Sequence, residues 1–338
     1  MATYKAIKGF KIKSLSADPS TLDEGDIWYN STSGALKTAQ PFATAWAAGG
    51  NMSSQKALNG TGIQTATLGM GGYLNTAPAG NYQVNEVEEY NGSSWTSKTA
   101  LSNDIYLQSA TGTVTSALSA GGNRPPGGGP TTNTSEEYDG SSWTAGGNLN
   151  TARRGLVGVG TQTATVAFSG DVNPGYSALT EEYNGASWTV QNTLTTARTA
   201  TTSQGAGTQT AALCCGGMTG SATNVVEEYN GASWTASPAM PRNFYFGMSG
   251  GTTADAFAVG GETTAGSGPT CKDTTDLWNG TAWSNDTATL GTARYQGGGS
   301  GTGPAGLCFG GATGTNVKQT ATEEYTAAYI GAKTVTTS

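Results

Sequence analysis

Histidine does not occur in this sequence of 338 residues. Without imidazole, the usual zinc and copper sites and the Ser–His and Cys–His catalytic pairs cannot be built. Cysteine is also scarce, and the four cysteines form no CxxC pair, so reduced thiols are expected rather than a disulfide framework. The sequence therefore predicts no metal site and no cofactor.

Charge is scarce as well. Charged residues make up 12% of the sequence, about half the usual share, and the net charge is -7. A basic surface for nucleic acid is not expected from this balance. No stretch of 18 apolar residues occurs, and Met1–Ser20 lacks the apolar segment of a secretory signal. We therefore expect neither nucleic acid as a partner nor insertion into a membrane.

Glycine is abundant, with 52 residues, about twice the usual share. It accompanies an internal repeat, in which a phrase occurs as EEYNGSSWT, EEYDGSSWT, EEYNGASWT (twice), DLWNGTAWS and a truncated last copy. The aromatic third residues of the phrase are Tyr90, Tyr138, Tyr183, Tyr229, Trp278 and Tyr325, at steps of 48, 45, 46, 49 and 47 residues. The tryptophans form a parallel series with one earlier member: Trp46, Trp95, Trp143, Trp188, Trp234 and Trp283. Six repeats of this length are typical of solenoids and propellers.

Each repeat indicates four short strands. A first strand of small residues and a GTQT-like turn precede an apolar run that often closes with Gly-Gly. The EEY strand follows a variable loop, and Asn-Gly or Asp-Gly then predicts a tight hairpin to the tryptophan strand. Because no apolar stripe with helical spacing persists, no helix is expected. Residues 42–330 are predicted to form a six-bladed β-propeller of four antiparallel strands per blade, residues 1–41 an attachment segment and residues 331–338 a short tail.

The last repeat lacks a tryptophan, whereas Ala43–Gly49 looks like a fourth strand without its first three. We expect this N-terminal strand to complete the sixth blade beside Glu323–Tyr325. The alternative is the C-terminal segment Tyr329–Val335, in which Ile330 stands at the tryptophan position. Either arrangement removes exposed sheet edges.

The apolar run, Gly-Gly, Tyr and Trp at this period resemble the kelch motif of β-propellers, over about residues 42–330. The wording EEYNGSSWT, GGNLNTAR and GTQTA resembles repeat proteins of tailed, especially marine, bacteriophages, and GDIWYNSTSGALK in Pro19–Lys37 resembles the leader of phage fibre proteins. The resemblance implies a virion protein made in the host cytoplasm. It would be attached through its N-terminal segment to other virion proteins, as a homo-oligomer. A fibre-type adhesin for a host-surface glycan or protein is the expected function, and a capsid-decoration or tail-assembly protein is the alternative.

One face of the propeller would carry all the variable loops, and we expect ligand binding there. The loops are Tyr73–Asn85, Asn123–Thr134, Asp171–Thr180, Met218–Val225, Glu262–Lys272 and Ala312–Gln319. Flat aromatic rings suit sugars, and amides offer paired donors and acceptors. The candidates are Tyr73, Tyr82 and Tyr176 with Asn81, Asn123 and Asn173.

Four cations occupy matching positions before the first strands, and we expect them on the same face. They are Lys56, Arg153, Arg198 and Arg294, with Arg242 nearby and Ile105 interrupting the series. Together they could attract an acidic glycan. Alternatively, each cation caps carbonyls or pairs with a glutamate of an EEY strand.

No catalytic residue is predicted. A second alternative function, a sialidase-like hydrolase, would need an arginine triad and a Tyr/Glu nucleophile pair, and the repeated residues single out neither. The duplicated glutamates of the EEY strands are better explained as a half-solvated strand face.

Overall fold

The computed structural model describes residues 12–76, 80–125, 129–172, 174–199, 205–264 and 271–335. Every regular element in these ranges is a β-strand. The described ranges therefore contain no helix that could cross a membrane. The strands form seven sheets of four strands, one of which has an additional strand. The chain divides into a larger unit, Ala45–Thr326, and a smaller unit whose described part is residues 12–44 and 327–335.

The larger unit contains six sheets, here called repeat sheets 1 to 6, in which all neighbouring strands are antiparallel. Sheet 1 is β5 (Lys56–Ile63), β6 (Ala66–Thr76), β8 (Val87–Tyr90) and β9 (Trp95–Lys98), with β7 (Gly80–Gln83) added to β6. Sheet 2 is β10 (Ser109–Thr113), β11 (Ser116–Ala120), β12 (Ser135–Tyr138) and β13 (Trp143–Ala145). Sheet 3 is β14 (Val157–Thr161), β15 (Ala164–Phe168), β16 (Thr180–Tyr183) and β17 (Trp188–Gln191).

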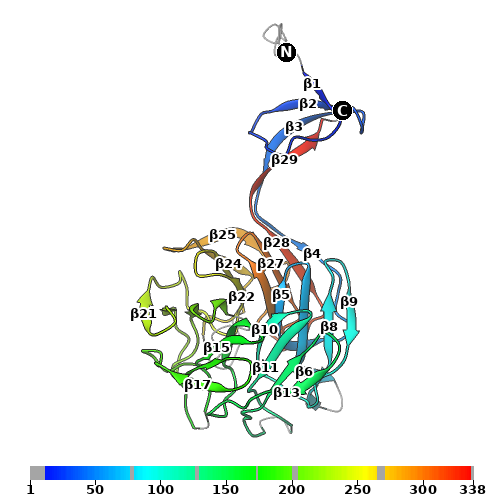
Figure 1. Ribbon diagram of the computed structural model, residues 1–338. Helices are drawn as coiled ribbons and strands as arrows, with labels where there is room; N and C mark the ends of the chain where they lie inside the picture. Colours follow the sequence, from blue (N-terminus) through cyan, green and yellow to red (C-terminus); the bar gives the residue numbers. More distant parts are fainter. Residues whose placement is uncertain are drawn as a thin grey trace. The chain divides into compact units, whose positions relative to one another are not determined.

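Sheet 4 is β18 (Ala206–Thr208), β19 (Ala211–Cys215), β20 (Val226–Tyr229) and β21 (Trp234–Ser237). Sheet 5 is β22 (Met248–Gly251), β23 (Ala256–Val259), β24 (Thr274–Trp278) and β25 (Trp283–Thr289). Sheet 6 is β26 (Gly298–Thr302), β27 (Ala305–Phe309), β28 (Thr322–Thr326) and β4 (Ala45–Ala48). The sheets follow one another around the unit in chain order (Figure 1).

The first strands of the repeat sheets contact one another in a closed cycle. β5 contacts β10, and the contacts continue through β14, β18, β22 and β26 back to β5. These strands are rich in glycine and other small residues, which allows them to crowd together. The all-β architecture, with sheets arranged in a cycle, is consistent with a β-propeller.

The cycle is completed by the N-terminal strand. β4 pairs with β28, and Trp46 lies opposite Tyr325. The expected closure by the N-terminal strand is therefore confirmed. The alternative C-terminal strand, β29 (Tyr329–Thr334), instead pairs with β3 (Ala35–Phe42) of the smaller unit, where the rings of Phe42 and Tyr329 stack at 5.0 Å.

This pairing also revises the expected domain limits. The larger unit spans Ala45–Thr326 rather than residues 42–330, and residues 329–334 of the expected propeller end and tail form a strand. The physical reason is that β3 offers a free edge to a second strand and an aromatic partner to Tyr329, so the two chain ends form one sheet.

The repeated phrase builds the outer half of each repeat sheet. Its third residue lies opposite its tryptophan, with ring centroids 4.9–5.5 Å apart in all six sheets. The Asn-Gly turns form as expected; in the first, the N–H of Asn91 donates to the carbonyl of Ser94, and Gly92 has a φ of 90°. Several tryptophans bond across to the preceding sheet, as when Trp95 Nε1 donates to Thr322 Oγ1 at 2.8 Å.

The hairpins between first and second strands also join neighbouring sheets. Gln162 Nε2 donates to the carbonyls of Ala117 and Tyr138 in sheet 2, at 3.0 and 2.7 Å. Gln64 and Gln209 make the same double contact with sheets 6 and 3. Six glycines with positive φ stand in these hairpins, where a Cβ would lie 2.1–2.3 Å from a backbone oxygen: Gly62, Gly112, Gly160, Gly207, Gly251 and Gly301. Only glycine fits these positions.

The smaller unit is a single sheet in the order β1 (Lys13–Leu15), β2 (Ile27–Asn30), β3 and β29, in which β1 and β2 are parallel. Asp18 bonds to two residues of the GDIWYN sequence, Trp28 and Asn30, and to Lys37. The carboxylate of Asp18 accepts hydrogen bonds from Lys37 Nζ, Asn30 Nδ2 and Trp28 Nε1 at 2.8, 2.7 and 3.0 Å. These bonds, that of Lys37 first, lower the pKa of Asp18 to about 2.

Candidate functional site at the mouth of the sheet cycle

The four cations of the matching series lie inside the repeat sheets. Lys56, Arg153, Arg198 and Arg294 are all fully buried. Each forms an ion pair with the first glutamate of its own EEY strand, at N–O distances of 2.9–3.1 Å: Lys56–Glu88, Arg153–Glu181, Arg198–Glu227 and Arg294–Glu323. These contacts agree with the alternative that each cation pairs with a glutamate of an EEY strand. Because the four side chains are enclosed, they do not face a ligand at the mouth as expected.

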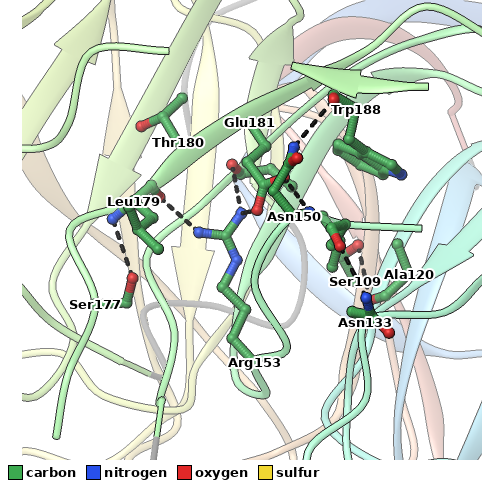
Figure 2. Close-up of polar contacts among 12 residues, drawn as sticks. Ser109, Ala120, Asn133, Asn150, Arg153, Ser177, Leu179, Thr180, Glu181 and Trp188 are labelled. Atoms are coloured by element: carbon green, nitrogen blue, oxygen red, sulfur yellow. Dashed lines mark hydrogen bonds and ion pairs between the residues drawn. The ribbon is translucent and has the colours of Figure 1, made fainter. Parts of the chain in front are cut away.

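Arg153 shows what these cations do (Figure 2). Besides its ion pair, Nη1 donates to the carbonyl of Leu179 at 2.9 Å. The second oxygen of Glu181 accepts from the backbone and side-chain nitrogens of Asn150, at 2.7 and 2.8 Å. Burial lowers the pKa of Arg153 to about 10, while the charge of Glu181 opposes the shift. The cation thus ties the entry of the first strand to the third strand.

Two repeat sheets depart from this pattern. In sheet 2 the position holds Ile105, and Glu136 is half-buried and accepts from the backbone N–H of Ser102. In sheet 5 the position holds Phe244. Arg242, two residues upstream, pairs with Asp276 through Nε at 2.8 Å from Oδ2. Its guanidinium lies 5.0 Å from the centroid of the Phe244 ring. An apolar residue is therefore compatible with this position when the acid of the third strand has another partner, as Glu136 and Asp276 have.

A second layer lies next to the buried pairs, at the start of the variable loops. In each sheet, three residues joined by isolated β-bridges or strand pairing form a row, and bridged residues present their side chains to the same side. We call these rows the mouth ring. For sheets 1 to 6 the rows are Ala57, Tyr73 and Gln83; Tyr106, Asn123 and Thr131; Arg154, Asp171 and Tyr176; Thr199, Met218 and Ala222; Tyr245, Glu262 and Cys271; and Tyr295, Ala312 and Lys318.

Beneath the mouth ring lies a belt of backbone hydrogen bonds between neighbouring sheets. Leu107, Phe246 and Gln296 have φ values of 59°, 52° and 55°, and Gly155 at the equivalent position has 59°. The N–H of Gly155 donates to the carbonyl of Leu107, and the N–H of Gln296 to that of Phe246, both at 2.8 Å. A left-handed backbone at a large residue costs roughly 1–3 kcal/mol and persists only where the surroundings hold it. These bonds provide that support and give the mouth a fixed floor.

A cavity of about 340 Å³ opens at the mouth over this floor. Its walls combine aromatic, thioether and charged side chains; the lining residues are Leu107, Arg154, Gly155, Asp171, Tyr176, Thr199, Met218, Tyr245 and Phe246. The rings of Tyr245 and Phe246 lie 4.1 Å apart. Arg154 and Asp171 form an ion pair at 3.0 Å, in which both side chains remain partly exposed, at 32% and 23%.

The rest of the mouth ring is crowded with polar aromatic groups. Tyr73 stacks on Tyr106 at 5.1 Å, and Lys318 Nζ lies 5.6 Å from the centroid of the Tyr73 ring. Burial and the nearby hydroxyls of Tyr295, Tyr245 and Tyr73 raise the pKa of Tyr106. Burial lowers the pKa of Lys318 to about 8 and raises that of Glu262. Side chains from sheets far apart in the sequence therefore meet at this mouth.

Six uncharged candidates were expected from the sequence, and the structure places three of the four whose side chains are described at the mouth. Tyr73, Asn123 and Tyr176 belong to the mouth ring, and Tyr176 lines the cavity. Tyr82 lies on β7, 49% exposed, and does not line the cavity. Asn173 and the side chain of Asn81 lie outside the described residues.

Sequence reasoning missed Arg154, Asp171, Tyr245 and Phe246. A signal for two of them was present, because Arg154 and Tyr245 directly follow the position of the buried cation, and that next residue differs from repeat to repeat. A variable residue beside a repeated one, at the same place in every unit, is the pattern of a diversified surface on a fixed scaffold.

Within the described ranges, no three histidine, cysteine, aspartate or glutamate side chains gather in a group that could hold a metal ion. The four cysteines form no disulfide; Cys214, Cys215 and Cys308 are buried and Cys271 is half-buried. Burial raises the pKa of Cys215 and of Cys308, which keeps both thiols protonated.

The smaller unit presents a second surface. Alternation along β2, β3 and β29 places Ile27, Tyr29, Leu36 and Val335 on one side of the sheet. Ile27, Tyr29 and Val335 are 55%, 41% and 45% exposed, whereas Trp28 on the opposite side is 2% exposed. We call the first side the apolar face; from strand alternation its remaining members with described side chains are Ile12, Ser14, Thr38, Gln40, Phe42, Tyr329 and Lys333.

Comparison with known proteins adds one finding. No family model and no curated protein matches the sequence. Among solved structures, that of YjhT is similar, with a TM-score of 0.65 and 12% sequence identity over 83% of this chain and 99% of YjhT. The likeness is one of fold. It agrees with an all-β arrangement of several sheets around a common centre.

Proposed function

We propose that the chain is a six-bladed, kelch-like β-propeller of a tailed bacteriophage virion that acts as a fibre-type adhesin without enzymatic activity. The six repeat sheets are the blades, and the mouth ring is the surface that binds a host glycan or protein. The phage assignment is supported by the resemblance of the repeat sequences, and of the N-terminal sequence GDIWYN, to those of phage proteins.

The observation that carries the binding role is the contrast between two neighbouring layers. The buried cation–glutamate pair recurs in four of the six repeat sheets and an Arg242–Asp276 pair replaces it in a fifth, whereas the mouth ring one residue away contains aromatic, charged, amide and aliphatic side chains. A rigid scaffold that presents a varied, concave surface is the arrangement expected of a binding module. The cavity over the fixed floor belongs to that surface.

Catalysis has less support. A glycosidase needs two carboxylates that flank the scissile bond. The acids of the mouth ring are Asp171, which is paired with Arg154, and Glu262, which does not line the cavity.

The smaller unit fits an attachment role. A single sheet must bury its apolar side against another layer, and the apolar face carries one charged residue, Lys333, and no acid. We propose that apolar faces of two or more copies pack against one another, so that the protein assembles as a homo-oligomer in the virion. Identical sheets with uncharged centres can stack without burying like charges.

The test of the adhesin is binding of the purified full chain to host cells. Tyr176→Ala and Tyr245→Ala should weaken binding at least about 10-fold, the effect of losing one well-packed contact. The control is Ile63→Ala, because Ile63 is 56% exposed and stands at the opposite, first-hairpin end of sheet 1. Equal losses from all three changes would place the binding site elsewhere. Failure of the intact protein to bind any host surface, with normal incorporation into virions, would favour the capsid or tail-assembly alternative.

A further inference from the structure

We propose that the cavity at the mouth binds an uncharged pyranose sugar, through two adjacent hydroxyl groups held by Arg154 and Asp171. This inference rests on the proposed binding function and names the chemistry of its ligand. It departs from the acidic glycan expected from the sequence.

The ion pair leaves Arg154 Nη1 and Asp171 Oδ1 without a partner among the described residues. Arg154 Nε and Nη2 both donate to the same oxygen of Asp171, Oδ2, at 3.1 and 3.0 Å. Arg154 Nη1 and Asp171 Oδ1 make no other hydrogen bond among the described residues, and both side chains line the cavity while partly exposed. Neighbouring hydroxyls of a sugar can accept from the guanidinium and donate to the carboxylate at once.

The pair is held in place by its own backbone. The N–H of Asp171 donates to the carbonyl of Arg154 at 2.7 Å, and the N–H of Arg154 donates to the carbonyl of Asp171 at 3.1 Å. The positions of the two side chains therefore do not depend on the side-chain contact alone. A preorganised donor and acceptor lose less conformational entropy on binding than free side chains would.

Apolar surface for a sugar ring stands beside this pair. Tyr176 is bridged directly to Asp171, so its ring projects to the same side. Tyr245, supported by Phe246, and Met218 complete the lining. Sugar rings present C–H groups on one face and hydroxyls at the edge, which matches aromatic walls with polar groups at one side. A cavity of about 340 Å³ lies at the lower end of the range for small-ligand sites and suits one sugar unit.

The charges at the mouth favour a neutral ligand. Arg154 is neutralised by Asp171, and the four cations of the matching series are enclosed with glutamates. The remaining charged members of the mouth ring, Glu262 and Lys318, are opposite in sign and are buried, at 8% and 3% exposure. Within the mouth ring, whose members are all described, positive and negative charges are therefore equal in number and leave no excess positive charge to hold a sialic or phosphorylated sugar.

The experiment is an NMR titration of the full chain with the methyl pyranosides of glucose, galactose and mannose, and with their monodeoxy analogues. Lactose and 3′-sialyllactose form a neutral and acidic pair. We expect at least one methyl pyranoside to bind. Removal of either hydroxyl of one adjacent pair should weaken it about 10- to 100-fold, the range for hydrogen bonds to charged groups. Sialyllactose should bind no better than lactose.

Arg154→Ala and Asp171→Ala should cause the same loss of sugar binding. The matched control is Lys98→Ala, because the pair Lys98–Glu89 on sheet 1 has nearly the same exposure, 34% and 23%, at a distance of 2.7 Å. Unchanged backbone NMR shifts away from the mouth will show that each variant is folded.

The outcomes separate this inference from the proposed function. If the protein binds host cells but none of the pyranosides, or if Arg154→Ala and Asp171→Ala bind the sugar normally, the inference is wrong and the adhesin stands. A preference for sialyllactose over lactose would also overturn it. Absence of both cell binding and sugar binding would remove the two proposals together.

Discussion

Two consecutive arginines perform different tasks in this molecule. Arg153 is fully buried in an ion pair, whereas Arg154 is partly exposed at the mouth. Successive residues of an extended chain point to opposite sides, so one faces the interior of the sheet and the next faces the cavity. Loss of either arginine should therefore affect stability differently. Removing one partner of a buried ion pair leaves an uncompensated buried charge, whereas an exposed ion pair contributes little to the free energy of unfolding.

We therefore predict that Arg153→Met lowers the free energy of unfolding by about 3–5 kcal/mol, whereas Arg154→Met changes it by less than about 1 kcal/mol. The measurement is urea denaturation followed by tryptophan fluorescence. Arg153→Met combined with Glu181→Gln should recover most of the loss, since the unpaired carboxylate is then gone. A double variant as unstable as Arg153→Met alone would show that packing of the guanidinium, rather than its charge, matters.

At the scale of elements, the sheets are joined by side chains of the repeated phrase. The tyrosine of one sheet donates to a carboxylate of the preceding sheet, as Tyr90 does to Glu324 at 2.5 Å and Tyr183 to Glu137 at 2.5 Å. Tyr229 and Tyr325 make the same contact with Glu182 and Asp286. Together with the glutamine contacts at the hairpins, these bonds hold sheets 1, 3 and 4 to their preceding sheets at two places each.

These contacts predict a loss of stability in alkali. Burial and the bond to Glu324 raise the pKa of Tyr90 from 10.0 to about 12. The protonated phenol is thus favoured by folding, so its stabilisation is complete below about pH 10 and is lost as the pH rises towards 12. Free energies of unfolding measured at pH 9 and pH 11 should differ less in Tyr90→Phe than in the parent. An identical difference would show that Tyr90 ionises normally in the folded protein.

The chain divides into two units and passes between them twice, between Thr44 and Ala45 and between Thr326 and Ala327. The larger unit contains the complete cycle of sheets, including the closing strand β4. Each repeat sheet buries its sides against two neighbours, so the stability of the cycle depends on its closure. The smaller unit has no second layer among its described residues and leaves its apolar face uncovered.

A fragment of residues 45–326 should therefore fold, with an unfolding transition close to that of the repeat sheets in the full chain. A fragment of residues 49–326 lacks β4 and with it the packing of Trp46 on Phe257 and Tyr325. It should be destabilised by about 3 kcal/mol, because it loses both the packing of the partly buried Trp46 and the pairing of β4 with β28. Circular dichroism during heating provides the comparison. Equal stability of the two fragments would mean that closure by β4 is unimportant.

The full chain should associate through its smaller unit. Analytical ultracentrifugation should find the full chain oligomeric and the fragment of residues 45–326 monomeric. The change Ile27→Asp should shift the full chain towards monomer, because a charge at the centre of a buried apolar surface is costly. As a control, Val190→Asp alters a residue of the larger unit that is 54% exposed and should leave association unchanged. A monomeric parent chain would contradict self-association.

The sequence by itself determined the four strands of each repeat, because these depend on local patterns that recur along the chain. It favoured Ala43–Gly49 over Tyr329–Val335 as the closing strand but left both open. Asn-Gly turns, small first strands and the Tyr–Trp pair are each encoded within a few residues. Only the tertiary structure decided which residues face the cavity. Arg154, Tyr176 and Tyr245 come from different strands and repeats, and they meet because the sheets close into a cycle. The sequence placed Arg153 and Arg154 together, but the burial of one against Glu181 and the exposure of the other depend on strand orientation within the closed cycle.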